Sequence, residues 1–110
     1  MELGEVVAER RIEGRAPDGT PFEVVIRFGA PRTDPLSDND DWVCPHRIDG
    51  FGDGAVGAAH GVDSLQALLL SVHAVGLKLA ESDSTFDWLG MPALGLTVAP
   101  GQPGQPAKTG

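Results

Sequence analysis

Basic residues, cysteine and long apolar runs are scarce in this sequence, and each scarcity excludes a class of protein. Lysine and arginine number 8 against 16 aspartates and glutamates, so the chain of 110 residues carries a net charge of -8. Proteins that bind a nucleic-acid backbone need clustered Lys and Arg, and we therefore expect no nucleic-acid partner. The single cysteine, Cys44, excludes an internal disulfide framework and every zinc site that is built from several cysteines.

Membrane and secretory signals are also missing from the pattern. The most apolar stretch, residues 65–80, is interrupted by polar side chains and is shorter than a transmembrane helix. The first residues are acidic and polar, whereas a signal peptide begins with a basic region followed by an apolar one. We therefore expect no membrane partner and a location in the bacterial cytoplasm.

The apolar content is sufficient for one hydrophobic core. Hydrophobic residues make up 41% of the chain and charged residues 22%, a composition typical of a folded globular domain. The length fits one domain, which we place at residues 1–98. Residues 99–110 are rich in Gly, Pro and Gln, and this composition predicts a disordered tail.

An alternating pattern near the N-terminus predicts a β-hairpin. Residues 6–12 and 22–28 have the composition of strands, and the second segment alternates with a period of two. Between them, residues 16–20 (Ala-Pro-Asp-Gly-Thr) suit a tight turn with Gly19 in the left-handed region. This turn fixes a register with four facing pairs: Ile12 with Val24, Ala8 with Phe28, Glu9 with Arg27, and Glu13 with Glu23.

The remainder of the domain predicts a third strand, a helix and a final strand. Residues 42–48 form the third strand, which Pro45 should confine to a sheet edge or to a bulge. Residues 30–41 and 50–61 are expected to be connections, and residues 82–87 a loop. The helix begins after Asp63, which should cap it, and the last strand covers residues 94–98. The predicted fold is therefore α+β, a small antiparallel sheet of three or four strands in ββ-β-α-β order with one main helix packed on it.

The predicted helix is more apolar than one sheet face requires. A stripe at helical spacing should face the sheet, and further leucines and valines widen it beyond one side. The stripe comprises Leu65, Leu68, Leu69, Val72, Gly76 and Leu79. The excess allows a homodimeric structural module that joins two copies through this helix.

Acidic residues are concentrated in the second part of the chain. Residues 33–98 contain ten acids and two bases, a net charge of -8, and four aspartates lie between residues 30 and 41. Opposite charge speeds the association of protein partners, so we expect a basic protein partner. The predicted contact residues are Asp38, Asp40, Asp41 and Trp42. The sequence thus favours a non-enzymatic acidic interaction module, such as an immunity-like or antagonist protein, and no cofactor is expected.

An alternative interpretation centres on the few residues that can ligate metal or act as nucleophiles. Cys44 and His46 lie on one face of the predicted third strand, and His60 lies in the glycine-rich connection. These three residues could form a metal site or a small enzyme's active site. The string Gly-x-Gly-x-x-Gly at residues 52–57 does not lead directly into a helix, so we interpret it as a connector.

Several segments together resemble a small bacterial domain family of unknown function. They are Glu9-Arg10-Arg11, Trp42-Val43-Cys44, Ile48-Asp49-Gly50, residues 61–68 (Gly-Val-Asp-Ser-Leu-Gln-Ala-Leu) and Trp88-Leu89-Gly90. The resemblance covers about residues 5–98. It implies a shared α+β fold and a bacterial origin, and it assigns no catalytic or binding residue.

Overall fold

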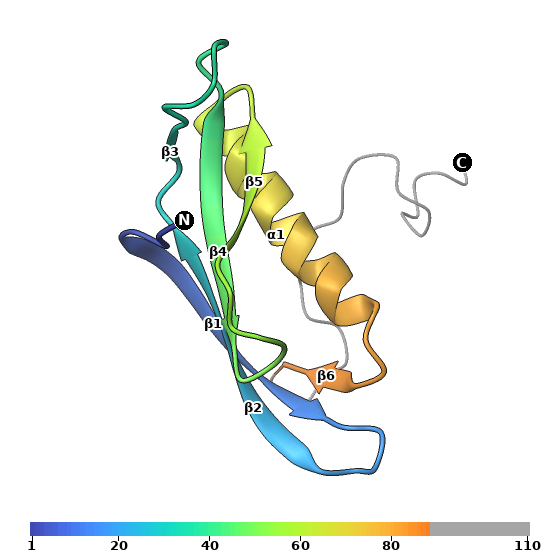
Figure 1. Ribbon diagram of the computed structural model, residues 1–110. Helices are drawn as coiled ribbons and strands as arrows, with labels where there is room; N and C mark the ends of the chain where they lie inside the picture. The colour runs from blue at the N-terminus through green and yellow to red at the C-terminus, as the bar shows by residue number, and fades with distance from the viewer. Residues whose placement is uncertain (89–110) are drawn as a thin grey trace, which may run out of the picture.

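The computed structural model describes residues 1–88, and Figure 1 shows their arrangement. In chain order the elements are β1 (Val6–Arg15), β2 (Pro21–Gly29), β3 (Arg32–Thr33), β4 (Trp42–Asp49), β5 (Gly57–Gly61), α1 (Ser64–Ala80) and β6 (Thr85–Asp87). The predicted strand at residues 94–98 and the predicted tail at residues 99–110 lie outside the described residues.

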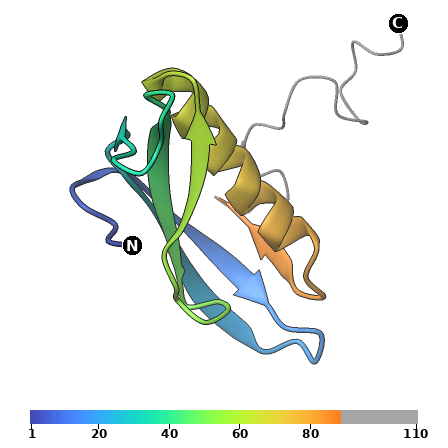
Figure 2. The same ribbon diagram turned by 45° about the horizontal axis from the view of Figure 1, so that its top comes forward.

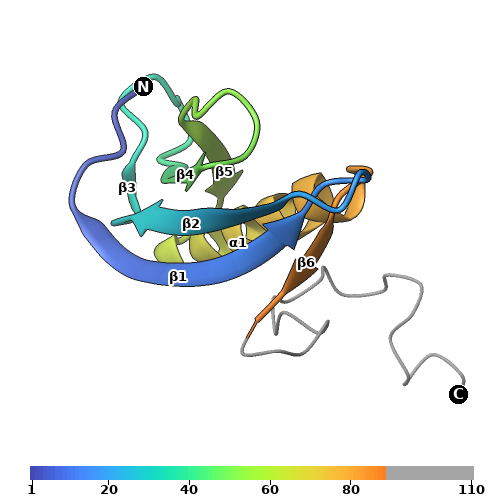
Figure 3. The ribbon, with the colours of Figure 1, turned by 90° about the horizontal axis from the view of Figure 1, so that it is seen from below.

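The strands form one antiparallel sheet that curls into a half-barrel. Their order is β3-β4-β2-β1-β6, and β5 pairs with β4 off this path. The helix lies along one face of the sheet (Figure 2), and β1 is strongly bent when seen from below (Figure 3). The predicted sheet of three or four strands is therefore wrong, because the described residues contain six. The missed strands β3, β5 and β6 are short and lie in segments whose composition is that of loops.

The N-terminal hairpin forms in the predicted register. Cross-strand partners include Ile12 with Val24, Ala8 with Phe28, Glu9 with Arg27, and Glu13 with Glu23. At the turn, the amide of Gly19 donates to the carbonyl of Ala16 over 2.8 Å, and Gly19 has a φ of 90°. The carboxylate of Asp18 accepts from the amide of Thr20, and this hydrogen bond holds the pKa of Asp18 below its ordinary value. The turn residues alone thus specified the pairing.

The third predicted strand exists as β4, but it is not at the edge. It pairs with β2 and β3 along one side and with β5 along the other. The ladder to β2 ends at His46, and the ladder to β3 begins at Val43, so neither reaches Pro45. Five residues of the β2–β3 segment (28 to 32) oppose four of β4 (46 to 43), and the one extra residue is a bulge. Proline is tolerated in this internal strand because it lies at the interruption.

The N-terminus of α1 is capped as the sequence predicts. The carboxylate of Asp63 accepts from the amide of Gln66 over 2.8 Å, and Asp63 has extended backbone angles. The side-chain oxygen of Gln66 in turn accepts from the amide of Val62, one residue before the cap. Both ends of this reciprocal arrangement satisfy amides that have no partner within the helix.

The helix buries only part of the predicted stripe, since Leu79 is buried and Val72 packs against the core, whereas other members of the stripe are exposed. Its buried residues are Ala67, Ser71, Val75 and Leu79. Leu65 and Leu69, which belong to the predicted stripe, are 61% and 45% exposed. Small side chains face the sheet because α1 lies close to β5: a Cβ at Gly61 would come within 2.6 Å of the amide of Ala67. Close approach of the two backbones therefore limits the buried face to small side chains near the start of α1, whereas Val75 and Leu79, farther along, pack in the hydrophobic core.

The hydrophobic core lies between α1 and the concave face of the sheet. It contains Ile12, Val24, Ile26, Phe28, Ile48, Val75, Leu79 and Phe86. Trp88 packs against this core, and the guanidinium carbon of Arg10 lies 3.8 Å from the centroid of its ring. One end is closed by three rings, with Phe51 and Phe86 edge to face at 5.2 Å and Phe22 stacked on Phe51.

Candidate interaction site

The acidic loop, residues 34–41, connects β3 to β4 and is held by its own hydrogen bonds. The amide of Asp34 donates to the carbonyl of Asp41 over 2.8 Å, which closes the base of the loop. Ser37 organises the interior, since its hydroxyl oxygen accepts from the amides of Asn39 and Asp41. It also donates to the carboxylate of Asp41 over 3.0 Å. The loop therefore has a defined shape, which lowers the entropic cost of binding a partner.

The tip of the acidic loop combines one apolar side chain with free carboxylates. Leu36 is 90% exposed, the largest exposed fraction among the large apolar residues of the described chain. Asp38 and Asp40 are also exposed, and no ion pair within residues 1–88 involves them. Asp40 has a φ of 57°, a conformation that Asp and Asn adopt more readily than other side chains. An apolar side chain beside uncompensated charges is suited to contact with a partner rather than to packing within the chain.

The predicted contact residues do not all have the same role. Asp41 is half-buried and accepts from Ser37, so its carboxylate supports the loop. Trp42 is half-buried at the start of β4, where it lies opposite Thr33 and Gly61. Leu36 was not among the predicted contact residues. The signal that could have identified it is a leucine enclosed by prolines, serine and aspartates, with no strand or helix periodicity.

His60 is linked to the acidic loop. Its Nε2 atom lies 3.2 Å from a carboxylate oxygen of Asp34, which forms an ion pair when the imidazole is protonated. His60 lies opposite Val43 in the β4–β5 ladder, whereas Cys44 lies opposite Ala59. Because side chains alternate between the faces of a sheet, His60 lies on the opposite face from Cys44 and His46. The three residues of the alternative interpretation are therefore not brought together.

Beneath α1, a buried polar contact joins the helix to β4. The Nδ1 atom of His46 lies 2.7 Å from the hydroxyl oxygen of Ser71, which donates to the carbonyl of Cys44 over 3.0 Å. The hydroxyl has one hydrogen, so when it donates to the carbonyl of Cys44, Nδ1 must carry the imidazole proton and donate it to Ser71. Nε2 faces Gly57, where a Cβ would come within 2.6 Å of it. Ser71 was not predicted, because a serine within an apolar run gives no distinguishing signal.

The protonation states of His46 and Cys44 favour a structural role for both residues. Burial lowers the pKa of His46, and the positive charge of Lys78 lowers it further. Burial raises the pKa of the Cys44 thiol, although Ser71 and Arg32 partly oppose the effect. Cys44 is fully buried, and its sulfur lies 3.4 Å from the carbonyl oxygen of Gly29. A neutral thiol and a neutral imidazole beneath a helix link secondary structure elements, whereas a reactive cysteine needs thiolate character and access.

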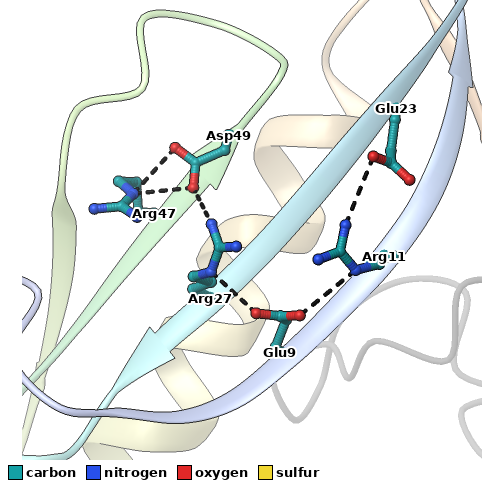
Figure 4. Close-up of polar contacts among 6 residues, drawn as sticks. All are labelled: Glu9, Arg11, Glu23, Arg27, Arg47 and Asp49. Carbon is teal, nitrogen blue, oxygen red and sulfur yellow. Dashed lines mark hydrogen bonds and ion pairs between the residues drawn. The ribbon is translucent and has the colours of Figure 1, made fainter.

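The convex face of the sheet carries a row of alternating charges (Figure 4). Arg27 lies between Glu9 and Asp49 and forms an ion pair with each, and Arg47 binds the same Asp49. Arg11 bridges Glu9 to Glu23. Three arginines thus balance three carboxylates on neighbouring strands, which leaves this part of the surface nearly neutral.

An acidic row follows on the same sheet, nearer to β6. Glu13 lies opposite Glu23 on β2 and opposite Asp87 on β6. Cross-strand neighbours are about 5 Å apart, and like charges at that distance destabilise the pairing. The row gives the chain a second acidic surface, distinct from the acidic loop.

Neither a metal centre nor a membrane-spanning helix is found among the described residues. Within residues 1–88, no three His, Cys, Asp or Glu side chains are grouped so that they could hold a metal ion. In the same range, no helix is both long enough and apolar enough to cross a membrane.

Comparison with known proteins places the chain in a family. A family model described as "Domain of unknown function (DUF6968)" matches residues 8–98. No curated protein and no solved structure matches the chain. Since the model covers most of the chain and nearly all of the fold described above, the protein belongs to the DUF6968 family of domains of unknown function.

Proposed function

We propose that this protein is a non-enzymatic interaction module that binds a basic protein partner through its acidic loop. The observation that carries the proposal is the tip of that loop, where exposed Leu36 adjoins the unpaired carboxylates of Asp38 and Asp40. Apolar side chains that enter a pocket supply much of the energy of protein interfaces, and surrounding charges supply orientation and speed. An antagonist or immunity-like protein that neutralises a basic partner, such as a nuclease toxin, has this combination.

The net charge of the chain supports the same class of partner. The charge of -8 attracts a positively charged protein over roughly one Debye length, about 8 Å at physiological ionic strength. The arginines of the convex face are already paired with carboxylates, so they do not oppose that attraction. Salt should therefore weaken binding, chiefly by slowing association.

The test compares two variants that change the net charge equally. The loop variant carries Asp38→Asn and Asp40→Asn, and asparagine at position 40 retains the left-handed backbone. The control variant carries Glu13→Gln and Asp87→Asn in the acidic row. Each immobilised protein is incubated with bacterial lysate at low and at moderate salt, and captured proteins are quantified by mass spectrometry.

The two variants separate a specific site from a general charge effect. We expect a basic protein that binds the unchanged chain and the control variant, is lost from the loop variant, and weakens with salt. Leu36→Ala should reduce its capture at both salt concentrations, because that substitution removes apolar contact and leaves the charge unchanged. Equal losses from the loop variant and the control variant would refute a site at the acidic loop.

A further inference from the structure

The edge of the sheet at β5 is open. Strand β5 (Gly57–Gly61) pairs with β4 along one side, and within residues 1–88 no other backbone hydrogen bond involves it. It contains neither lysine nor proline, residues with which proteins commonly protect such an edge. The strand therefore presents main-chain donors and acceptors with which another extended segment can pair.

The proline of β4 decides which residues of β5 face outward. In an antiparallel ladder, successive opposed pairs alternate between pairs that exchange two hydrogen bonds and pairs that exchange none. Pro45 lies opposite Ala58 and has no N–H group with which to complete such an exchange. The hydrogen-bonded pairs are therefore those on either side of it. Ala58 and His60 consequently turn their N–H and C=O groups away from β4.

The surroundings of this edge are acidic. Residues 34–63, from the acidic loop to the cap of α1, contain seven aspartates and one arginine. That arginine, Arg47, is already paired with Asp49. The contact of His60 with Asp34 links β5 to the acidic loop, and Figures 1 and 2 show the two at the same end of the sheet. A segment that approaches β5 thus enters a negative potential, which favours lysine and arginine.

We propose that the basic partner adds an extended segment to the open edge of β5, and that basic and apolar residues alternate along this segment. The inference rests on the proposed function, because it gives the partner of the acidic loop a second point of contact. Main-chain hydrogen bonds to Ala58 and His60 hold the added strand, and the aspartates of residues 34–63 attract its basic side chains.

The two faces of the sheet explain the alternation. Side chains of an added strand point alternately to either face. Helix α1 lies on the face of Gly61, and it has no charged residue between positions 64 and 77, so apolar side chains suit that face. His60 and Asp34 lie on the other face, one strand spacing of about 4.8 Å from the added strand, within the length of a lysine or arginine side chain.

The short edge sets the expected strength. Ala58 and His60 together offer two N–H and two C=O groups, and β5 has only five residues. Binding through this edge alone should therefore be weak, with a dissociation constant between micromolar and millimolar. In the whole partner, the acidic loop adds to this affinity because both contacts belong to one molecule.

Three synthetic peptides test the main-chain contact. The probe is acetyl-Lys-Val-Lys-Val-Lys-Val-amide, and NMR of the labelled full chain measures its binding. A second peptide has the same sequence with a methyl group on every backbone nitrogen, so it keeps the charge and loses the donors. Methylation should raise the dissociation constant at least about tenfold. A third peptide, with glutamate in place of lysine, should not bind, because its charge has the wrong sign.

Hydrogen exchange locates the contact on the chain. The amides of Ala58 and His60 should exchange quickly in the free chain, because they point away from β4, and the probe peptide should slow both. The amide of Ala59 is the internal control. It donates within the β4 ladder, so it should exchange slowly with and without the peptide.

Two substitutions at one position test the same hydrogen bond from the side of the protein. Ala58→Pro removes an outward N–H, whereas Ala58→Val keeps it, and proline is tolerated in an edge strand where the N–H faces solvent. The proline variant should bind the probe peptide several-fold more weakly than the valine variant. Circular dichroism checks that both are folded, and the methylated peptide makes the comparison independently if the proline variant is not.

Three results would overturn the proposal. Equal binding of the methylated and unmethylated peptides would show that charge alone explains the contact. Absence of binding at millimolar peptide would show that the edge does not accept a strand. Slow exchange of Ala58 and His60 in the free chain would mean that the edge is already covered, by its own chain or, if the protection depends on concentration, by a second copy. None of these results bears on the acidic loop, which the capture experiment tests separately.

Discussion

Removing the hydroxyl of Ser71 should destabilise the protein far more than its size suggests. Ser71 is fully buried, and its hydroxyl joins α1 to β4 by contacts with the imidazole of His46 and the carbonyl of Cys44. The variant Ser71→Ala deletes one oxygen atom, so the cavity that it creates is small. It leaves two buried polar groups without this partner, and each such loss costs about 1–3 kcal/mol.

The expected magnitude follows from that count. Partial relaxation of the helix should leave a net loss of about 2–3 kcal/mol in unfolding free energy. A domain of this size has a total stability of about 5–15 kcal/mol, so the loss is a large fraction of it. The midpoint of thermal unfolding should fall by about 10–20 °C, at about 4–8 °C per kcal/mol.

Urea unfolding measures this loss directly. Trp42 and Trp88, from different parts of the fold, provide the fluorescence signal. The control is Ser64→Ala, in which an exposed serine at the first position of α1 is replaced by a better helix former, and it should change stability by less than about 0.5 kcal/mol. A double-mutant cycle with His46→Leu should give a coupling energy of about 1 kcal/mol.

The result that would refute the reasoning is a Ser71→Ala variant as stable as the Ser64→Ala control. Equally, a coupling energy of zero with His46→Leu would show that the two side chains do not act together. Either result would mean that α1 is held by apolar packing alone.

Three further predictions concern charge, protonation and access. Because burial lowers the folded-state pKa of His46 below its ordinary value of 6.5, the unfolded chain binds more protons below neutrality. Stability from this group is complete above about pH 6.5 and falls as the pH drops through the folded-state pKa. Calorimetry should show that His46→Gln flattens this fall, and an unchanged pH dependence would contradict the reasoning. Glu13→Gln should stabilise the chain by a few tenths of a kcal/mol at low salt, because Glu13 lies between Glu23 and Asp87, and urea unfolding at high salt should show the gain disappearing. Cys44 should react with iodoacetamide near neutral pH only at the rate at which the structure opens, because its thiol is buried and its pKa is raised; fast alkylation of the folded chain would contradict its buried position.

Local chemistry in the sequence determined the elements whose residues are close along the chain. The turn from Ala16 to Thr20 set the hairpin register, because a tight turn with glycine in the left-handed region permits one pairing of the strands it joins. Asp63 and Gln66 located the start of α1 for the same reason, since capping involves neighbouring residues. The concentration of aspartates in the acidic loop could likewise be recognised from the sequence, because the number of charged residues in a segment does not depend on the fold.

Contacts between distant segments were decided only by the tertiary structure. The strand β5 has the composition of a connector, and it forms because β4 offers a free edge to Gly57–Gly61. Its glycines let α1 approach closely, so Ala67 and Ser71 are buried while Leu65 and Leu69 remain outside. A prediction from hydrophobic periodicity assumes that the most apolar side of a helix faces the core. It contains no information on how close the backbone of the opposing strand lies.

The candidate sites were likewise determined partly by the sequence and partly by the tertiary structure. The sequence predicted Asp38 and Asp40 as contact residues, whereas the tertiary structure showed exposed Leu36 in the same loop and gave Asp41 a supporting role. Cys44, His46 and His60 are close in the sequence, yet strand alternation and the pairing of β4 with β5 set His60 on the other face. Side-chain chemistry is a property of the sequence, but which side chains meet depends on sheet pairing, and sheet pairing joins residues that are far apart along the chain.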